Sequence, residues 1–199
     1  MSVRGSLPAL FLGPTTEHVP KVPDASLLAL RVGEKGRVRD FRVESQQPYV
    51  NWCWAGVAAG VINSYGGAGA TSRDQVARRV LGGRYPADEP QLLHVVLGDH
   101  FAPPMLEVGA ADATPGRFEA TIKREIDAQR PVCAEVVSSI VHYVGIAGYN
   151  IASRDDIELL IQDPADDDPD GRSYVPIREF MDNYNQRFGW ARTFRTKAG

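Results

Sequence analysis

The sequence contains only two cysteines, and these stand far apart, at positions 53 and 133. Two cysteines are too few for a disulfide scaffold, and without a Cys-x-x-Cys pair there is no signature of a zinc or redox site. Cys133 lies in the apolar run Pro131–Val137, which indicates a reduced, buried strand residue. The alternative is one disulfide between the two cysteines, and it would consume the thiol of Cys53.

An excess of basic residues is also absent, since 22 Lys and Arg stand against 25 Asp and Glu. Nucleic-acid binding needs a basic face, so the charge balance argues against it. No apolar run approaches the ~18 residues that a membrane span requires. The apolar stretch at residues 6–14 is too short and too rich in proline for a secretory signal peptide. We therefore expect a cytoplasmic protein, or one exported without a classical signal peptide.

What the chain does have is an unusual segment at residues 46–61, where a polar stretch containing Pro48 leads to Cys53. The residues after Cys53 are rich in Ala, Gly and Val and predict a helix that ends near Tyr65. A cysteine at a helix N-terminus lies in the positive end of the backbone dipole, which favours the nucleophilic thiolate. Gln47 lies six residues earlier, where its amide could donate to a developing oxyanion.

This segment resembles the papain-like cysteine peptidases, in which a Gln lies six positions before a Cys-Trp pair that opens a helix. Gln47, Cys53 and Trp54 match that pattern, and the run from Asn51 onward is most similar to a bacterial branch that includes avirulence effector proteases. The resemblance implies that Cys53 is the nucleophile, that Gln47 binds the oxyanion, and that Trp52, Trp54 and Asn51 line the substrate cleft. The alternative is a structural cysteine between core tryptophans.

Two further residues complete a catalytic set. His142 lies near the start of an apolar strand expected at residues 140–150, which is similar to the His-containing strand of the papain family. Asp163 follows the next expected strand, residues 157–162, across one hairpin. It could therefore accept a hydrogen bond from the imidazole and stabilise the imidazolium. The alternatives are a satisfied core histidine and a simple Asp-Pro turn. We expect His94 and His100 to be partly exposed surface residues.

The order of the elements predicts the fold class. Helices come first and strands second, which favours α+β. The resemblance implies a papain-like arrangement, with an N-terminal helical lobe whose nucleophile helix packs against a C-terminal twisted antiparallel β-sheet. Residues 1–36 would form an N-terminal arm or a pro-segment, and residues 37–199 the peptidase domain. Helices are expected at 53–65, 72–81, 88–98, 115–129 and 177–184, and strands at 36–43, 131–137, 140–150, 157–162, 172–175 and 189–194.

The function expected from this resemblance is that of a cysteine endopeptidase with a thioester acyl-enzyme. The scheme needs no metal and no cofactor. Its partner would be a protein or peptide substrate, including a target protein of a host or competitor. The alternatives are transglutaminase- or deamidase-type acyl transfer and a catalytically silent effector that binds a partner. The acidic run Asp166–Asp170 imitates half of an EF-hand loop. We interpret this run as a solvated loop, with calcium binding or selection of basic substrates as the alternatives.

Overall fold

The computed structural model describes residues 30–66, 70–108, 115–153, 155–166 and 173–199. Most of the proposed N-terminal arm and residues 167–170 of the acidic run lie outside these ranges. Within them, no helix is both long and apolar enough to cross a bilayer.

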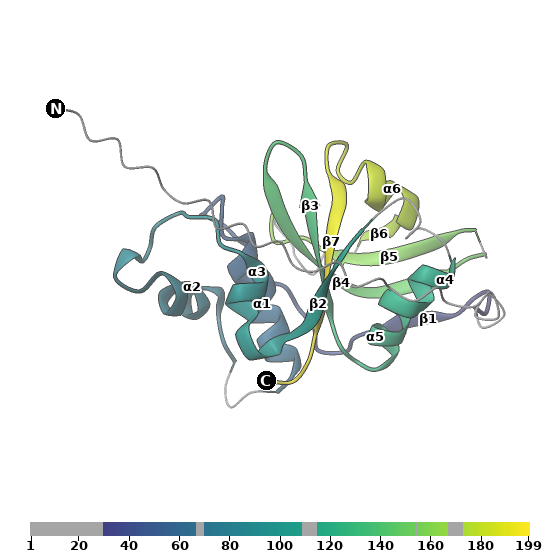
Figure 1. Ribbon diagram of the computed structural model, residues 1–199, viewed down its shortest axis with the longest axis horizontal. Coiled ribbons are helices and arrows are strands. Elements are labelled where there is room, and N and C mark those ends of the chain that lie inside the picture. Colours follow the sequence, from purple (N-terminus) through teal and green to yellow (C-terminus); the bar gives the residue numbers. More distant parts are fainter. Residues whose placement is uncertain (1–29, 67–69, 109–114, 154, 167–172) are drawn as a thin grey trace.

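The described residues form one seven-stranded antiparallel sheet (Figure 1). Its order is β2-β7-β3-β4-β5-β6, and β1 pairs with the far end of β4. The central strand β4 therefore contacts β3 and β1 along one edge and β5 along the other. The strands are β1 (Lys35–Arg37), β2 (Phe101–Glu107), β3 (Val132–Val137), β4 (Val141–Ile151), β5 (Ile157–Gln162), β6 (Ser173–Pro176) and β7 (Gly189–Thr196).

The helices form two groups on either side of this sheet, with one further helix, α6, next to β6 and β7 (Figure 1). Helices α1, α2 and α3 lie together, and α1 packs against β4. Helices α4 and α5, joined by a π-helical turn at Glu119–Lys123, lie near β1. The α-helices are α1 (Cys53–Ser64), α2 (Arg73–Leu81), α3 (Leu93–Leu97), α4 (Pro115–Phe118), α5 (Arg124–Asp127) and α6 (Ile177–Asp182). The predicted α+β class, helices packed against an antiparallel sheet, is confirmed.

The helices that carry strong local signals lie where the sequence predicts them. Helix α1 begins at Cys53 and is buried over most of its length. Helix α2 begins after Ser72, whose hydroxyl accepts from the backbone of Gln75 while the Gln75 side chain accepts from the backbone of Ser72. This reciprocal capping box satisfies two backbone N–H groups at the helix start, which explains why the pattern is readable in sequence.

Other predicted elements are wrong in extent. The helix expected at 88–98 is reduced to the five residues of α3, because residues 85–92 form a loop that accepts hydrogen bonds from the start of α1. The strand expected at 36–43 is reduced to β1, since side-chain contacts rather than a ladder hold residues 41–43. The strand β2 was not expected. It contains Pro103 and Pro104 and lies at the edge of the sheet, where proline is tolerated.

Candidate active site

The first part of the segment that leads to Cys53 lies between α1 and the end of β5, with Phe41 and Val43 buried. The Gln162 side chain, fully buried at the end of β5, accepts from Val43 N at 2.8 Å and donates to the Phe41 carbonyl at 3.1 Å. On the other side, a Cβ at Gly56 of α1 would collide with the Glu44 carbonyl oxygen. The small residues of α1 thus allow the helix to approach this segment closely, which fixes where the helix begins.

Cys53 is the first residue of α1 and is 5% exposed. The preceding Trp52 makes no side-chain capping bond to the helix. The first N–H groups of a helix have no partner within it, so the backbone N–H of Cys53 is directed out of the helix end. Cys53 therefore lies at the N-terminal end of a twelve-residue helix, which is the positive end of the helix dipole.

His142 and Asp163 form a short hydrogen-bonded pair. His142 Nε2 lies 2.6 Å from Asp163 Oδ1, and the two side chains are 8% and 2% exposed. The pairing follows from the sheet, in which β4 and β5 are antiparallel neighbours and Gly145 lies opposite Gln162. The end of β5 is therefore next to the start of β4, and the residue that follows β5 contacts the second residue of β4.

Cys53 and Asp163 both act on the ionisation of His142. Burial alone would lower the pKa of His142, but the hydrogen bonds and the charges of Asp163 and Cys53 raise it to about 10. Because Nε2 is taken by Asp163, Nδ1 is the ring nitrogen left for Cys53. The structure thus brings together three of the residues predicted from the sequence, in the order thiol, imidazole and carboxylate.

Asp163 receives hydrogen bonds from more than the imidazole. The Ala165 backbone N–H donates to Oδ1 at 2.8 Å, and the Tyr184 hydroxyl donates to Oδ2 at 2.8 Å. The Asn185 amide is 3.5 Å from Oδ2. Burial alone would raise the pKa of Asp163. The hydrogen bond and the charge of His142, together with the hydrogen bonds from Ala165 and Tyr184, nevertheless hold this pKa below its usual value. The carboxyl is therefore an anion in a site that offers it only donors.

Sequence reasoning missed the turn that provides these contacts. Tyr184 and Phe188 exchange backbone hydrogen bonds of 2.8 and 2.9 Å, and the Phe188 ring packs 5.8 Å from the His142 ring. Between them, Asn185 and Gln186 have left-handed φ values of 50° and 61°. Such strained backbone is concentrated at functional sites. The sequence contains no glycine here to indicate the conformation, so no sequence pattern would have found the turn.

The predicted oxyanion residue, Gln47, lies on an exposed turn, and its side chain is exposed. Its backbone N–H donates to the Ser45 hydroxyl at 3.3 Å. The neighbouring Gln46 is buried, and within the described residues its Oε1 has no hydrogen-bond partner. The backbone N–H of Gln46 donates to the Pro164 carbonyl at 2.7 Å, which connects the turn to the segment that carries Asp163.

The tryptophans that were expected to line the substrate cleft are core residues. Trp52 and Trp54 are both 0% exposed, so neither presents a surface to a substrate. Their indole N–H groups donate to the carbonyls of Ala87 and Glu89, each at 3.0 Å. They thus attach the start of α1 to the loop at residues 85–92. Asn51, in contrast, is exposed, as a residue in contact with substrate would have to be.

Cys133 and the two surface histidines lie apart from this site. Cys133 is fully buried in β3, where burial raises the pKa of its thiol, and both cysteines are free. His94 stacks on Phe194 at 6.3 Å, and both His94 and His100 are partly exposed, as expected from the sequence. In the part of the chain that the structure describes, no group of three or more His, Cys, Asp or Glu residues is placed to hold a metal ion.

Comparison with known proteins identifies the kind of fold that carries this site. The family described as Peptidase_C39 like matches residues 38–191, a span that includes all three residues of the thiol, imidazole and carboxylate series. A solved structure from Bacillus anthracis, described as a C39-like peptidase, is similar with a TM-score of 0.51 and 13% identity over 83% of this chain and 100% of that one. No protein with a curated description matches. The papain-like fold expected from the sequence is thus confirmed.

Proposed function

Because the chain belongs to the Peptidase_C39-like family, we propose that it is a cysteine peptidase that uses Cys53, His142 and Asp163. The observation that carries this proposal is the buried 2.6 Å pair of His142 and Asp163, with Cys53 close enough to the imidazole to raise the pKa of His142. The three residues come from a helix start, a strand start and a strand end that are distant in sequence. This is the geometry that nucleophilic catalysis requires, with a base next to the nucleophile and a third group that orients the base.

The proposed catalytic cycle begins when His142 takes the proton of the Cys53 thiol and becomes an imidazolium. The thiolate then attacks the carbonyl carbon of a peptide bond. When the tetrahedral intermediate collapses, the imidazolium gives that proton to the leaving amine and a thioester remains on Cys53. His142 then takes a proton from water, and the hydroxide releases the acid and restores the thiolate. Asp163 keeps the imidazole in the orientation that both transfers need.

The oxyanion of each intermediate needs donors next to the sulfur. The backbone N–H of Cys53 is one, because it is directed out of the start of α1. We assign the second to the side-chain amide of Gln47. Gln47 lies on the exposed turn that precedes the start of α1.

The substrate class proposed here is a protein or peptide. The resemblance to avirulence effectors, a host or competitor target, and export without a classical signal stay predictions. Two alternatives use the same residues differently. Transglutaminase- or deamidase-type chemistry would act on a glutamine side chain through the same thioester, and a silent effector would bind a partner without turnover.

One experiment separates these functions. The purified chain and its Cys53→Ala variant are incubated with a complex peptide library, and the products are analysed by mass spectrometry for new amine termini. We expect new termini with the wild-type chain and none with Cys53→Ala or His142→Ala. A one-dalton gain on glutamine, or an exchanged amide, would indicate acyl transfer at side chains instead. A library left unchanged by the wild-type chain would contradict catalysis and favour a binding module.

A further inference from the structure

The turn that carries Gln47 has an exposed surface but a tightly held backbone. Gln47, Pro48, Val50 and Asn51 are exposed, while the ring of Tyr49 stacks on Trp52 with centroids 3.9 Å apart. Hydrogen bonds also hold the turn. At its far end, the backbone N–H groups of Val50 and Asn51 donate to the Asp88 carboxylate at 3.3 and 2.8 Å.

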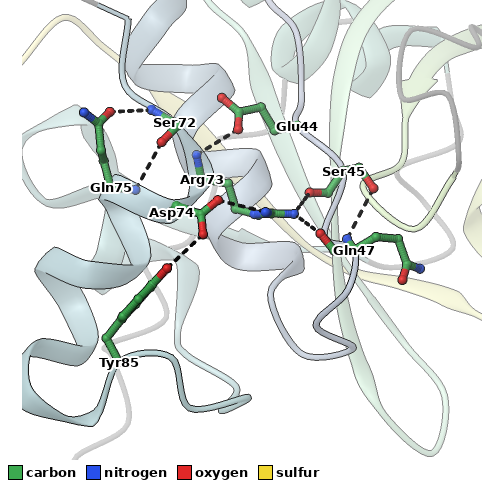
Figure 2. Close-up of polar contacts among 8 residues, drawn as sticks. All are labelled: Glu44, Ser45, Gln47, Ser72, Arg73, Asp74, Gln75 and Tyr85. Carbon is green, nitrogen blue, oxygen red and sulfur yellow. Dashed lines mark hydrogen bonds and ion pairs between the residues drawn. The ribbon is translucent and has the colours of Figure 1, made fainter.

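At its near end, the Arg73 side chain binds two backbone carbonyls of the turn, next to the bond from Gln47 N–H to the Ser45 hydroxyl (Figure 2). Arg73 Nη1 donates to the Ser45 carbonyl at 2.7 Å and also to the Gln47 carbonyl. In Figure 2 the Gln47 carbonyl faces this guanidinium, while the Gln47 side chain projects away from it. Arg73 therefore contacts the backbone of the proposed oxyanion residue and leaves its amide free.

Arg73 is itself fixed by neighbouring groups. Its Nη2 pairs with Asp74 at 2.8 Å, and Asp74 accepts from the Tyr85 hydroxyl at 3.0 Å. The backbone N–H of Arg73 donates to Glu44 Oε2 at 2.8 Å. The capping box at Ser72 fixes the first turn of α2, on which Arg73 lies (Figure 2).

The same guanidinium also reaches the residue before the nucleophile. Its central carbon lies 5.7 Å from the centroid of the Trp52 ring, and Trp52 is the N-cap of α1. The Arg73 side chain is 16% exposed, so its interactions are only partly screened by water. One cation thus connects the turn that carries Gln47 with the start of the helix that carries Cys53.

We propose that Arg73 is a positioning residue that sets the Gln47 amide at the oxyanion. This inference rests on the proposed function. Oxyanion donors are effective when they are held in place before charge develops, and an amide on a loose turn would have to be ordered in each transition state. Arg73 contacts neither substrate nor sulfur and acts only through the backbone at residues 45–47. Two carbonyls and a carboxylate match the planar, multi-donor guanidinium, whereas a lysine would reach one of them at a time.

The test is a double-mutant cycle on kcat for peptide hydrolysis. Arg73→Met removes the donors and keeps the aliphatic stem, Gln47→Ala removes the amide, and a third protein carries both changes. We expect Arg73→Met to lower kcat by about 10- to 100-fold, with KM within about threefold, because a single oxyanion donor is worth about 100- to 1,000-fold. The double variant is expected within about threefold of Gln47→Ala alone, since Arg73 acts through that amide.

A second measurement separates positioning from general damage. Alkylation of Cys53 by iodoacetamide needs the thiolate but forms no oxyanion, so its rate in Arg73→Met should stay within about twofold of wild type. Arg73→Lys is expected to have a kcat between those of Arg73→Met and the wild type. It replaces Arg73→Met in the cycle if Arg73→Met does not fold. Arg79→Met, which removes an exposed arginine of the same helix, is the matched control and should leave kcat unchanged.

Three results would overturn the inference while the peptidase proposal stands. The first is an unchanged kcat in Arg73→Met. The second is a double variant whose fold-loss in kcat equals the product of the two single-variant losses. The third is an alkylation rate in Arg73→Met that falls together with kcat. If the wild-type chain hydrolyses no peptide, the proposed function fails and the inference fails with it.

Discussion

The hydroxyl of Tyr184 donates a 2.8 Å hydrogen bond to Oδ2 of Asp163, while His142 occupies Oδ1 of the same carboxylate. Both Tyr184 and Asp163 are buried, so water does not substitute for either partner. The carboxylate that orients the proposed base is thus itself oriented by a residue between α6 and β7.

Replacement of Tyr184 by Phe should therefore reduce both stability and turnover. A hydrogen bond to a buried charged group contributes ~1.5–3 kcal/mol, so we expect a loss of that order in the free energy of unfolding, measured in urea. We expect kcat to fall by about tenfold, with KM little changed, because the hydroxyl donates to Asp163 and acts on the imidazole through that carboxylate. Tyr65→Phe, which removes a hydroxyl bonded to Thr196 at 2.7 Å, is the control for hydroxyl loss away from the site. Equal kcat in the two variants would contradict this role.

The pH dependence should reflect the raised pKa of His142, about 10 against 6.5 for the ordinary group. Since the folded state holds this proton more tightly, its stabilisation is complete below about pH 6.5, declines as pH rises and is gone above about pH 10. The imidazolium persists over the same range, so the alkaline limb of kcat/KM should lie near pH 10. A limb near pH 6.5 in the pH–rate profile would show that His142 is not paired as described.

Asp163→Asn should move that limb to lower pH. Asparagine preserves the shape of the side chain but removes the negative charge that helps to raise the pKa of His142. It also places an amide donor in a site where Tyr184, Ala165 and the imidazole already donate. Loss of the orienting carboxylate in a catalytic triad costs up to about 10,000-fold in kcat, so we expect a fall of at least about 100-fold. Activity close to wild type would reject Asp163 as the orienting residue.

The close approach of α1 to the buried segment predicts a strong effect of Gly56→Ala. The added methyl group would collide with the backbone carbonyl of Glu44, which cannot move aside as a side chain would. Overpacking of this kind costs ~1–3 kcal/mol, which thermal or urea unfolding would detect. Gly83→Ala is the matched control, because a Cβ there meets no atom within 4 Å. Equal stability of the two variants would show that the helix has room to shift.

The two cysteines should differ sharply in reactivity. Burial raises the pKa of the Cys133 thiol, and Cys133 is 0% exposed in the middle of the sheet. Iodoacetamide at neutral pH should therefore label Cys53 in the folded protein and label Cys133 only after denaturation. Peptide mapping by mass spectrometry distinguishes the two sites. Rapid labelling of Cys133 in the native chain would contradict the burial that the structure shows.

Much of the site was readable from the sequence because its signals are local. A cysteine before a run of small residues predicts a helix start, and α1 begins at Cys53. A strand, a hairpin and a second strand place Asp163 next to His142 without knowledge of the remaining fold. The resemblance to papain-like peptidases added the chemistry that we propose for these residues. These inferences needed only short-range periodicity, turn residues and one matched motif.

What the sequence could not give depends on contacts between distant segments. The indoles of Trp52 and Trp54 look like cleft residues in the motif, but the loop at 85–92 buries them. The sequence pattern around Arg73 indicates only the start of a helix, yet the Arg73 side chain binds the backbone of Gln47, 26 positions away. Tyr184 has no motif around it.

The sequence by itself thus determined that a helix begins at Cys53 and that His142 and Asp163 are neighbours, because helix starts and hairpins are set by neighbouring residues. The tertiary structure alone decided which groups hold that chemistry in place. The reason is physical, since hydrogen bonds between segments form only where packing brings a buried donor and acceptor together.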